Sequence, residues 1–255
     1  MITFIDVSKW NGVFDWSKAQ AQGVEGAWLK VCQDTVVDSK FKENSASCTL
    51  KYHAGYPYFD YRGKSGADQC KFFLDTVGSF SNMRDMLDLE DNSANGWPKL
   101  NSMLGVALRE ALAWVNEYIL EVKCEPAIYL NTGLTILKQL TVSGYQYTFR
   151  NFTKCPLVVA NYNKYILVNG AWVEMIKPPT GAWDECAGWQ HTSTGDGQLF
   201  GNAPGNIYID IDKIFNLQAL LKPGVTPEDE IPVPVELSDA EKLKILWAAH
   251  PELHK

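Results

Sequence analysis

The sequence predicts an α/β fold: an irregular TIM-like β/α barrel, followed by a short C-terminal linker and helix. Runs rich in β-branched residues alternate with helical patterns from the first residue onwards, and eight such runs can be counted. A chain of 255 residues is long enough for one barrel. Alternation favours a mainly parallel sheet, and eight strands favour its closure. The later units contain little helix, which is why we expect an irregular barrel.

The eight candidate strands share short length and branched or aromatic side chains. They are Ile2–Val7, Ala27–Val31, Tyr52–Phe59, Met86–Glu90, Pro126–Leu130, Leu157–Ala160, Ala187–His191 and Ile207–Ile211. Helical spacing of apolar residues predicts the segments between several of them. These helices are Trp16–Gln22, Lys40–Leu50, Asp68–Val77, Leu104–Val122 and Thr135–Leu140.

The chain changes character after Leu221. We expect the barrel to occupy residues 1–222, and residues 223–236 to form a linker because they are rich in proline and acidic residues. Residues 237–255 are predicted to contain a short amphipathic helix, which begins with the capping box Ser238–Glu241 and ends before Pro251. Because one helix cannot form a core, it is expected to dock on the barrel, on a second copy of the chain or on a partner.

Composition and charge exclude several classes of protein. The formal net charge of −7 and the absence of a basic cluster argue against nucleic acid as a partner. No stretch reaches the roughly 18 apolar residues of a membrane span, and the first residues do not resemble a signal peptide. The six cysteines form no CxxC pair, so we expect buried free thiols, as in a reducing cytoplasm.

Two carboxylates at the end of one predicted strand indicate chemistry. Asp88 and Glu90 are two residues apart in Met86–Glu90, so their side chains share a face, about 6.5–7 Å apart along the strand. At the carboxyl end of a barrel strand both would enter the mouth, where barrel enzymes bind substrate. Glycoside hydrolases use two converging carboxyl groups for catalysis, one protonated and one ionised.

Further acids are expected to join this pair. Asp6 lies at the end of the first strand, and Asp210 and Asp212 are assigned to the end of the last. Since the first and last strands of a closed barrel are neighbours, Asp6 and Asp210 are expected to meet. Mutual repulsion would raise the pKa of at least one of these acids. A metal site is the competing interpretation, which is less favoured because only His191 lies near these strand ends.

The order of short motifs from Phe4 to Leu221 resembles glycoside hydrolase family 25, the lysozymes found in fungi, actinomycetes and phage endolysins. The segments that carry the resemblance are Asp6-Val7-Ser8 with Trp10-Asn11-Gly12 and Asp15-Trp16; Phe41 with Asn44; Gly55-Tyr56-Pro57-Tyr58-Phe59; Ala67-Asp68-Gln69 with Phe72; Leu87-Asp88-Leu89-Glu90; Pro126-Ala127-Ile128-Tyr129; Leu157 to Tyr162; Trp189-Gln190-His191; and Ile209-Asp210-Ile211-Asp212.

The resemblance implies cleavage of the β-1,4 bond between N-acetylmuramic acid and N-acetylglucosamine, without a metal or other cofactor. It implies that Glu90 is the general acid and base, that Asp88 assists opposite it, and that Asp6 and Asp210 complete the acidic site. Whether Asp88 attacks directly or orients the 2-acetamido group for attack stays open. The implied substrate-binding residues are Tyr58, Tyr129, Tyr162, Trp189 and Lys30.

The sequence departs from the family pattern around the sugar subsites. After Lys30 the family has an acid where this chain has the amide Gln33. Tyr58 stands in place of the histidine of the family's Tyr-His-Phe motif, and Val158 stands in place of a tryptophan. All the proposed catalytic acids are retained. The departures therefore bear on substrate preference more than on the reaction.

Other functions remain as alternatives. A chitinase-like glycosidase also has an acidic strand pattern, but it leaves the Asp6-Val7-Ser8 start unexplained. A non-catalytic glycan-binding or phage structural barrel would have no need of a costly acid cluster. The start of the sequence, without a leader, favours an endolysin held in the host cytoplasm until lysis and then acting on cell-wall peptidoglycan. A secreted enzyme whose leader has been removed would have the same start.

Overall fold

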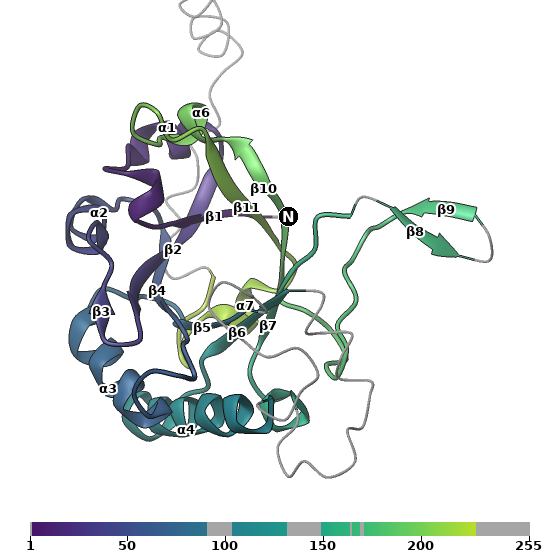
Figure 1. Ribbon diagram of the computed structural model, residues 1–255. Helices are drawn as coiled ribbons and strands as arrows, with labels where there is room; N and C mark the ends of the chain where they lie inside the picture. Colours follow the sequence, from purple (N-terminus) through teal and green to yellow (C-terminus); the bar gives the residue numbers. More distant parts are fainter. Residues whose placement is uncertain (1, 91–103, 132–148, 164, 169–170, 228–255) are drawn as a thin grey trace, which may run out of the picture. The chain divides into compact units, whose positions relative to one another are not determined.

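The chain folds into a closed barrel surrounded by helices (Figure 1). The computed structural model describes residues 2–90, 104–131, 149–163, 165–168 and 171–227. Eight strands close the barrel, and the predicted fold class is confirmed. They are β1 (Ile2–Val7), β2 (Val24–Gln33), β4 (Tyr52–Tyr58), β5 (Met86–Leu89), β6 (Ala127–Asn131), β7 (Leu157–Ala160), β10 (Gly188–Asp196) and β11 (Tyr208–Ile214).

The barrel closes through β1, which pairs parallel with β2 and antiparallel with β11. Neighbouring strands from β2 round to β10 are parallel, whereas β11 runs antiparallel to both of its neighbours. The prediction of a mainly parallel barrel is therefore right, with one reversed strand. This reversal decides how the acids of β11 are placed.

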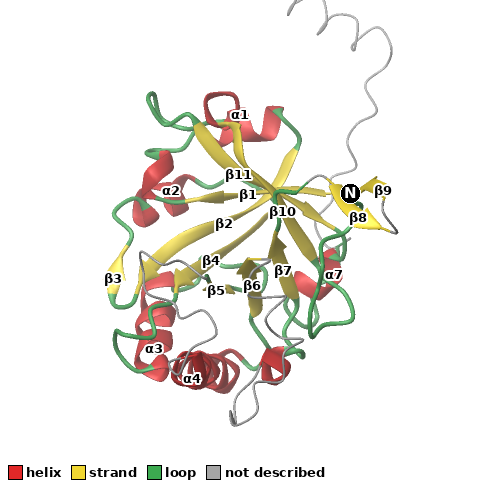
Figure 2. Cartoon of the chain, turned by 45° about the vertical axis from the view of Figure 1, so that its right-hand side comes forward, coloured by secondary structure: helices red, strands yellow, loops and turns green. Residues whose placement is uncertain are grey.

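Helices cover the outside of the strands (Figure 2). The helical segments are η1 (Lys9–Asn11), α1 (Trp16–Ala21), α2 (Phe41–Ser47), α3 (Gly66–Val77), α4 (Leu104–Val122), η2 (Phe149–Phe152), α6 (Gly197–Phe200) and α7 (Leu217–Leu220). Four of the five predicted helices are present, and Thr135–Leu140 lies outside the described residues. Three short strands were not predicted: β3 (Val36–Val37), which extends the sheet beside β2, and β8 (Tyr165–Val168) with β9 (Ala171–Glu174), which pair with each other.

Alternation along the strands sorts the side chains into two cores. Outward-facing residues such as Ile5, Leu29 and Leu87 join the apolar layer between the barrel and its helices. Phe4 faces inward, with its ring centroid 5.1 Å from that of Trp28 and 6.0 Å from that of Tyr52. These buried aromatic side chains fill the barrel interior below the acidic residues. The interior is therefore packed, and a cavity is left only towards the mouth.

Close approach of two outer helices requires a glycine. Gly66 begins α3, and a Cβ at this position would lie 1.8 Å from the backbone oxygen of Glu110 in α4. The Gly66 amide also donates to the Glu110 side chain at 3.0 Å. Any side chain here would force the two helices apart.

The chain divides into two compact units, Met1–Gly224 and Val225–Lys255. Of the second unit, only residues 225–227 are described, so the linker at 223–236 and the helix within 237–255 stay predictions. Within the described part of the chain, no helix is long and apolar enough to cross a membrane. The six cysteines are all unpaired, and five of them are buried, as expected.

Candidate active site

The four predicted catalytic acids line one cavity at the mouth of the barrel. Asp6 belongs to β1, Asp88 to β5 and Asp210 to β11, and Glu90 directly follows the last residue of β5. The cavity has a volume of about 80 Å³ and is bounded by carboxyl, phenol and amide groups. Its lining residues are Asp6, Tyr56, Met86, Asp88, Glu90, Tyr129, Tyr162, Gln190 and Asp210. Residues far apart in the sequence thus form one polar site.

Strand register places Asp6 directly opposite Asp210, as the sequence predicts. The assignment of both Asp210 and Asp212 to the end of the last strand is wrong, because β11 continues to Ile214 and runs in the reverse direction. Asp210 is therefore at the mouth, while Asp212 lies deeper, paired with Phe4 and Gln190. Asp212 is fully buried, and neither of its carboxyl oxygens makes a hydrogen bond of normal geometry to another described residue.

The Asp88 and Glu90 side chains enter the cavity from the same face of one chain segment. Asp88 pairs with Tyr58 on one side and with Tyr129 on the other, which fixes its position in the sheet. It is almost fully buried, and its Oδ1 atom has no hydrogen-bond partner among the described residues. Glu90 is only partly buried. The two carboxyls therefore occupy different environments: one is held within the sheet and the other lies at the opening.

Gln190 connects the acids to two tyrosines. Its Nε2 group donates to Asp6 Oδ2 at 2.6 Å, and its Oε1 atom accepts from the Tyr129 and Tyr162 hydroxyls at 2.9 and 2.5 Å. The amide thus fixes Asp6 on one side and both phenols on the other. Sequence reasoning missed Gln190, Tyr56 and Met86 as lining residues. Alternation along the strand could have identified Gln190, because neighbouring residues of a strand face opposite sides and only one of Trp189 and Gln190 can face the barrel interior.

Of the five predicted substrate-binding residues, Trp189 lines neither the acidic cavity nor the larger pocket beside it. It is buried, its indole N–H donates to the backbone oxygen of Asn161 at 2.7 Å, and the Lys213 ammonium lies 5.4 Å from its ring. Gln190, the next residue of β10, lines the cavity in its place. Tyr129 and Tyr162 do line it, and Tyr162 is about half exposed at the rim.

Burial and mutual repulsion favour the protonated form of these acids. Burial, followed by the charge of Asp210, raises the pKa of Asp6 well above its usual value, and burial with the charge of Glu90 does the same for Asp88. Burial raises the pKa of Asp210 to about 6. Burial also raises the pKa of Glu90, and the nearby Lys30 ammonium opposes that rise. The cluster can therefore hold a proton near neutral pH, as general acid catalysis requires.

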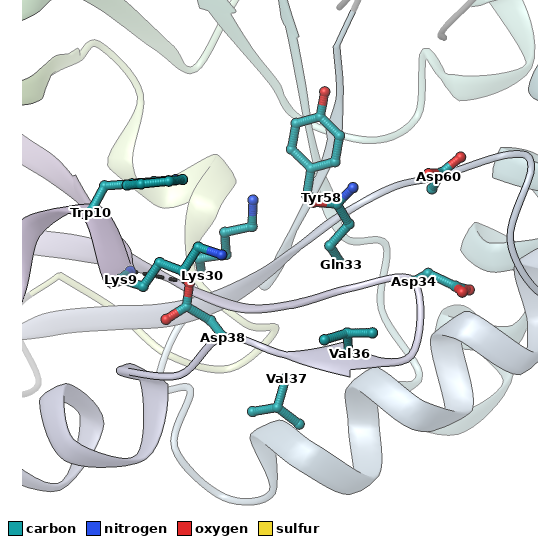
Figure 3. A pocket seen from close by; sticks show the side chains of 10 residues that line it. All are labelled: Lys9, Trp10, Lys30, Gln33, Asp34, Val36, Val37, Asp38, Tyr58 and Asp60. Atoms are coloured by element: carbon teal, nitrogen blue, oxygen red, sulfur yellow. Dashed lines mark hydrogen bonds between the residues drawn. The ribbon is translucent and has the colours of Figure 1, made fainter. Parts of the chain in front are cut away.

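Lys30 and Tyr58 border a second, larger pocket beside the acids (Figure 3). The Lys30 ammonium lies 4.4 Å from the centroid of the Tyr58 ring. Its charge lowers the pKa of Asp88 and of Glu90, against the effect of burial. Two predicted substrate-binding residues thus lie at the boundary between the pocket and the acidic cavity.

A metal site is the competing interpretation of the same acids. Among the residues that the structure describes, no three Asp, Glu, His or Cys side chains are arranged to hold a metal ion. The expectation that the reaction needs no cofactor stays a prediction, to be tested by chelation.

Comparison with known proteins gives both sequence and structural relatives. Lysozyme M1 of Streptomyces globisporus is 28% identical over 124 residues, which are 45% of this chain and 40% of that protein. The bacterial lysozyme of Streptomyces coelicolor has 20% identity and a TM-score of 0.66, over 86% of this chain and 94% of that chain. A GH25 lysozyme of Aspergillus fumigatus has 22% identity and a TM-score of 0.62, over 84% and 93%.

The two solved structures, at these low identities, show that the fold is shared. The sequence pattern described as Glycosyl hydrolases family 25 matches residues 5–198, a range that contains Asp6, Asp88 and Glu90. Because that range is well over half of the chain, the chain belongs to family 25 of the glycosyl hydrolases.

Proposed function

We propose that this chain is an N-acetylmuramidase, which hydrolyses the β-1,4 bond between N-acetylmuramic acid and N-acetylglucosamine in peptidoglycan. The observation that carries the proposal is the shared cavity of Asp88 and Glu90, closed on the far side by Asp6 and Asp210. Family membership supports a glycoside hydrolase, and Lysozyme M1 aligns with this chain over part of its length. Neither a chitinase-like activity nor a purely binding role has a specific observation in its favour.

In the proposed mechanism Glu90 donates its proton to the leaving oxygen. Burial raises the pKa of Glu90 against the charge of Lys30 and so favours the protonated carboxyl, while its partial exposure lets it reach the substrate. Asp88 remains beside it to stabilise the oxocarbenium-like centre or to orient the 2-acetamido group. After the leaving sugar departs, the Glu90 carboxylate takes a proton from the attacking water.

Asp6, Asp210 and Gln190 have a supporting role in this mechanism. The Gln190 amide donates to Asp6, which fixes the direction of that carboxyl, and accepts from Tyr129 and Tyr162. The Asp210 charge raises the pKa of Glu90 and so favours its acid form. These groups act through position and charge rather than by bond formation.

The decisive experiment is Glu90→Gln on purified cell wall. The change keeps the size of the side chain and removes the acidic proton that Glu90 donates to the leaving oxygen. Turnover should therefore fall by about 10²–10⁴-fold, with normal folding. Borohydride reduction of the wild-type products should give muramitol, since muramic acid becomes the new reducing end. Glu43→Gln, on the exposed side of α2, is the matched control and should cleave at the wild-type rate. Wild-type turnover in Glu90→Gln would refute the assignment.

We further propose that the enzyme acts as a phage endolysin, held in the host cytoplasm until lysis. Six unpaired cysteines, five of them buried, suit a reducing compartment. Cells that express the protein should grow normally and lyse only when their inner membrane is permeabilised. Lysis without permeabilisation, or loss of activity in reductant, would contradict this localisation.

The predicted C-terminal helix is proposed to dock on a surface by its Leu243, Leu246 and Trp247 stripe. A helix of this length is marginal alone in water, because about 12–15 residues is the usual lower limit. Truncation after Lys222 should leave cleavage of small soluble fragments unchanged, and light scattering would report any change of oligomeric state. Loss of cleavage by a truncated chain with an intact barrel spectrum would instead place the tail in the catalytic site.

A further inference from the structure

The pocket beside the acids is much larger than the catalytic cavity and is assigned no role in the mechanism above. Its volume is about 590 Å³, within the range of roughly 300–1,000 Å³ typical of small-ligand sites. Its lining residues are Lys9, Trp10, Lys30, Gln33, Asp34, Val36, Val37, Asp38, Tyr58 and Asp60. Lys30 and Tyr58 connect it to the catalytic acids, since Tyr58 pairs with Asp88 and the Lys30 charge acts on Glu90.

Two lysines and two aromatic rings form one side of this pocket. The Lys9 ammonium lies 5.0 Å from the Trp10 ring, and the Lys30 ammonium lies 4.4 Å from the Tyr58 ring. In the view of Figure 3 both amines lie between the two rings. Neither lysine has a carboxylate within 4 Å among the described residues. Trp10 is 73% exposed, although a tryptophan is a costly residue to leave in water.

The acids of the pocket are not the missing partners of these lysines. Both carboxyl oxygens of Asp38 accept backbone N–H groups, from Lys9 and from Lys40. Asp60 binds the Arg62 guanidinium. Asp34 accepts the backbone N–H of Lys64 through one oxygen. In Figure 3, Asp34 and Asp60 lie on the opposite side of the pocket from Lys9. The pocket thus has two lysines at one end, where both oxygens of Asp38 are already bonded to backbone N–H groups, and Asp34 and Asp60 at the other.

The edge of the sheet also opens on this pocket. Strand β3 lies at the end of the sheet and, among the described strands, pairs only with β2. Its residues Val36 and Val37 line the pocket and are 69% and 45% exposed. An exposed edge strand can accept an extended peptide through backbone hydrogen bonds, whereas a sugar cannot complete such a ladder.

We propose that this pocket binds the stem peptide carried by the N-acetylmuramic acid residue of the substrate. The inference rests on the proposed function, because it places the scissile bond at Glu90. On a glycan stripped of its peptides, the only carboxylate of each muramic acid is that of its lactyl group, whereas the stem peptide carries several free groups: carboxylates and, at its diamino acid, an amine. The carboxylates bind at Lys9 and Lys30, the peptide backbone runs along β3, and the amine is directed to the end that holds Asp34 and Asp60.

The test compares two substrates: purified glycan oligosaccharides with their stem peptides, and the same oligosaccharides after amidase treatment, which removes the peptide and leaves a free lactyl carboxylate on each muramic acid. Wild-type enzyme should have a kcat/KM at least about tenfold higher on the first. Lys9→Met should lower the ratio of the two kcat/KM values about tenfold, the effect of losing one charge-assisted contact of about 1.4 kcal/mol. Amidation of the peptide carboxylates should lower the wild-type ratio in the same way.

Lys42→Met is the matched control, because Lys42 is exposed on α2 and does not line the pocket; its ratio should equal that of the wild type. Equal kcat/KM on both substrates in the wild type would overturn the inference while leaving the muramidase intact. A Lys9→Met variant that loses activity equally on both substrates would also overturn it, and would assign the pocket to sugars.

If the wild type cleaves neither substrate, the proposed function fails, and the pocket is then judged by binding. Titration of the enzyme with the free stem peptide should shift the NMR signal of the Trp10 indole, with about tenfold weaker binding in Lys9→Met. Absence of any shift at Trp10 at millimolar peptide would overturn the inference.

Discussion

Substitution of Asp210 by asparagine should stabilise the fold at neutral pH while impairing the enzyme. Burial raises the pKa of Asp210 from its ordinary value of 3.8 to about 6, so the folded chain binds this proton more tightly than the unfolded chain does. Stability from this group is fully present below pH 3.8 and is lost as the pH rises through 6. The difference of about 2.2 between the two values corresponds to about 3 kcal/mol at about 1.36 kcal/mol per pH unit.

The asparagine variant cannot ionise at this position and so avoids that loss. At pH 4 only about 0.5 kcal/mol of this loss has occurred, since Asp210 is then neutral in the folded chain and about half ionised in the unfolded chain. Between pH 4 and pH 7.5 the variant should gain about 2.5 kcal/mol of stability relative to the wild type. Relief of the Asp210 charge on Asp6 and Glu90 acts in the same direction. Turnover should fall about 10–100-fold, because the pKa of Glu90 loses the contribution of that charge.

Urea unfolding followed by circular dichroism, at several pH values and constant ionic strength, measures the divergence. Asp75→Asn, on an exposed position of α3, is the control and should give a curve parallel to the wild type. Parallel curves for wild type and Asp210→Asn between pH 4 and 7.5 would refute the reasoning. They would mean that Asp210 is as well solvated in the fold as in the unfolded chain.

Three further outcomes are expected. Activity should survive EDTA, because the acids are proposed to hold protons and sugar hydroxyls; loss on chelation that a divalent cation restores would favour the metal interpretation. Gln190→Leu should lower kcat about 10–100-fold and shift the acidic limb of the pH–rate profile upwards, because the Gln190 hydrogen bond lowers the pKa of Asp6; an unchanged profile would remove Gln190 from the site. Gly66→Ala should cost about 3 kcal/mol of stability by urea unfolding, since its Cβ would lie 1.8 Å from the Glu110 oxygen; a midpoint equal to the wild type would show that α3 and α4 separate freely.

Much of the barrel could be predicted because its strands obey local rules. Ile2–Val7 and Leu157–Ala160 have the predicted bounds, and so does the helix Leu104–Val122, which is the longest of the described helices. The strand β10 extends to Asp196, five residues beyond its predicted end at His191. Its polar run Thr192–Asp196 has no apolar alternation, and its pairing with β11 replaces that local signal. Pairing with a distant strand determines whether such a segment forms a strand, and that pairing cannot be read from the segment's own sequence.

The candidate site was predictable in its acids and less so in its neutral groups. Carboxylates two residues apart at a strand end, such as Asp88 and Glu90, stand out because burying them is costly without a function. Gln190 is uncharged and adjacent to Trp189, an aromatic residue typical of sugar sites, so residue type alone favours Trp189 over Gln190 as the lining residue. The strand phase distinguishes them: Gln190 pairs with Asp212 and faces inward, and Trp189 pairs with Lys213 and does not line the cavity.

The direction of β11 explains how the last acid reaches the mouth. A parallel crossover after β10 would need a connection of a dozen or more residues, usually through a helix. The chain between Asp196 and Tyr208 is too short for this and holds only the four-residue α6. It therefore turns back, and β11 pairs antiparallel with β10 and β1. Because the strand is reversed, Asp210 near its start comes to lie opposite Asp6 near the end of β1, and Asp212 is buried one step deeper. The rule that barrel enzymes use the carboxyl ends of their strands thus holds for Asp6 and Asp88, whereas Asp210 enters the same cavity from an amino end.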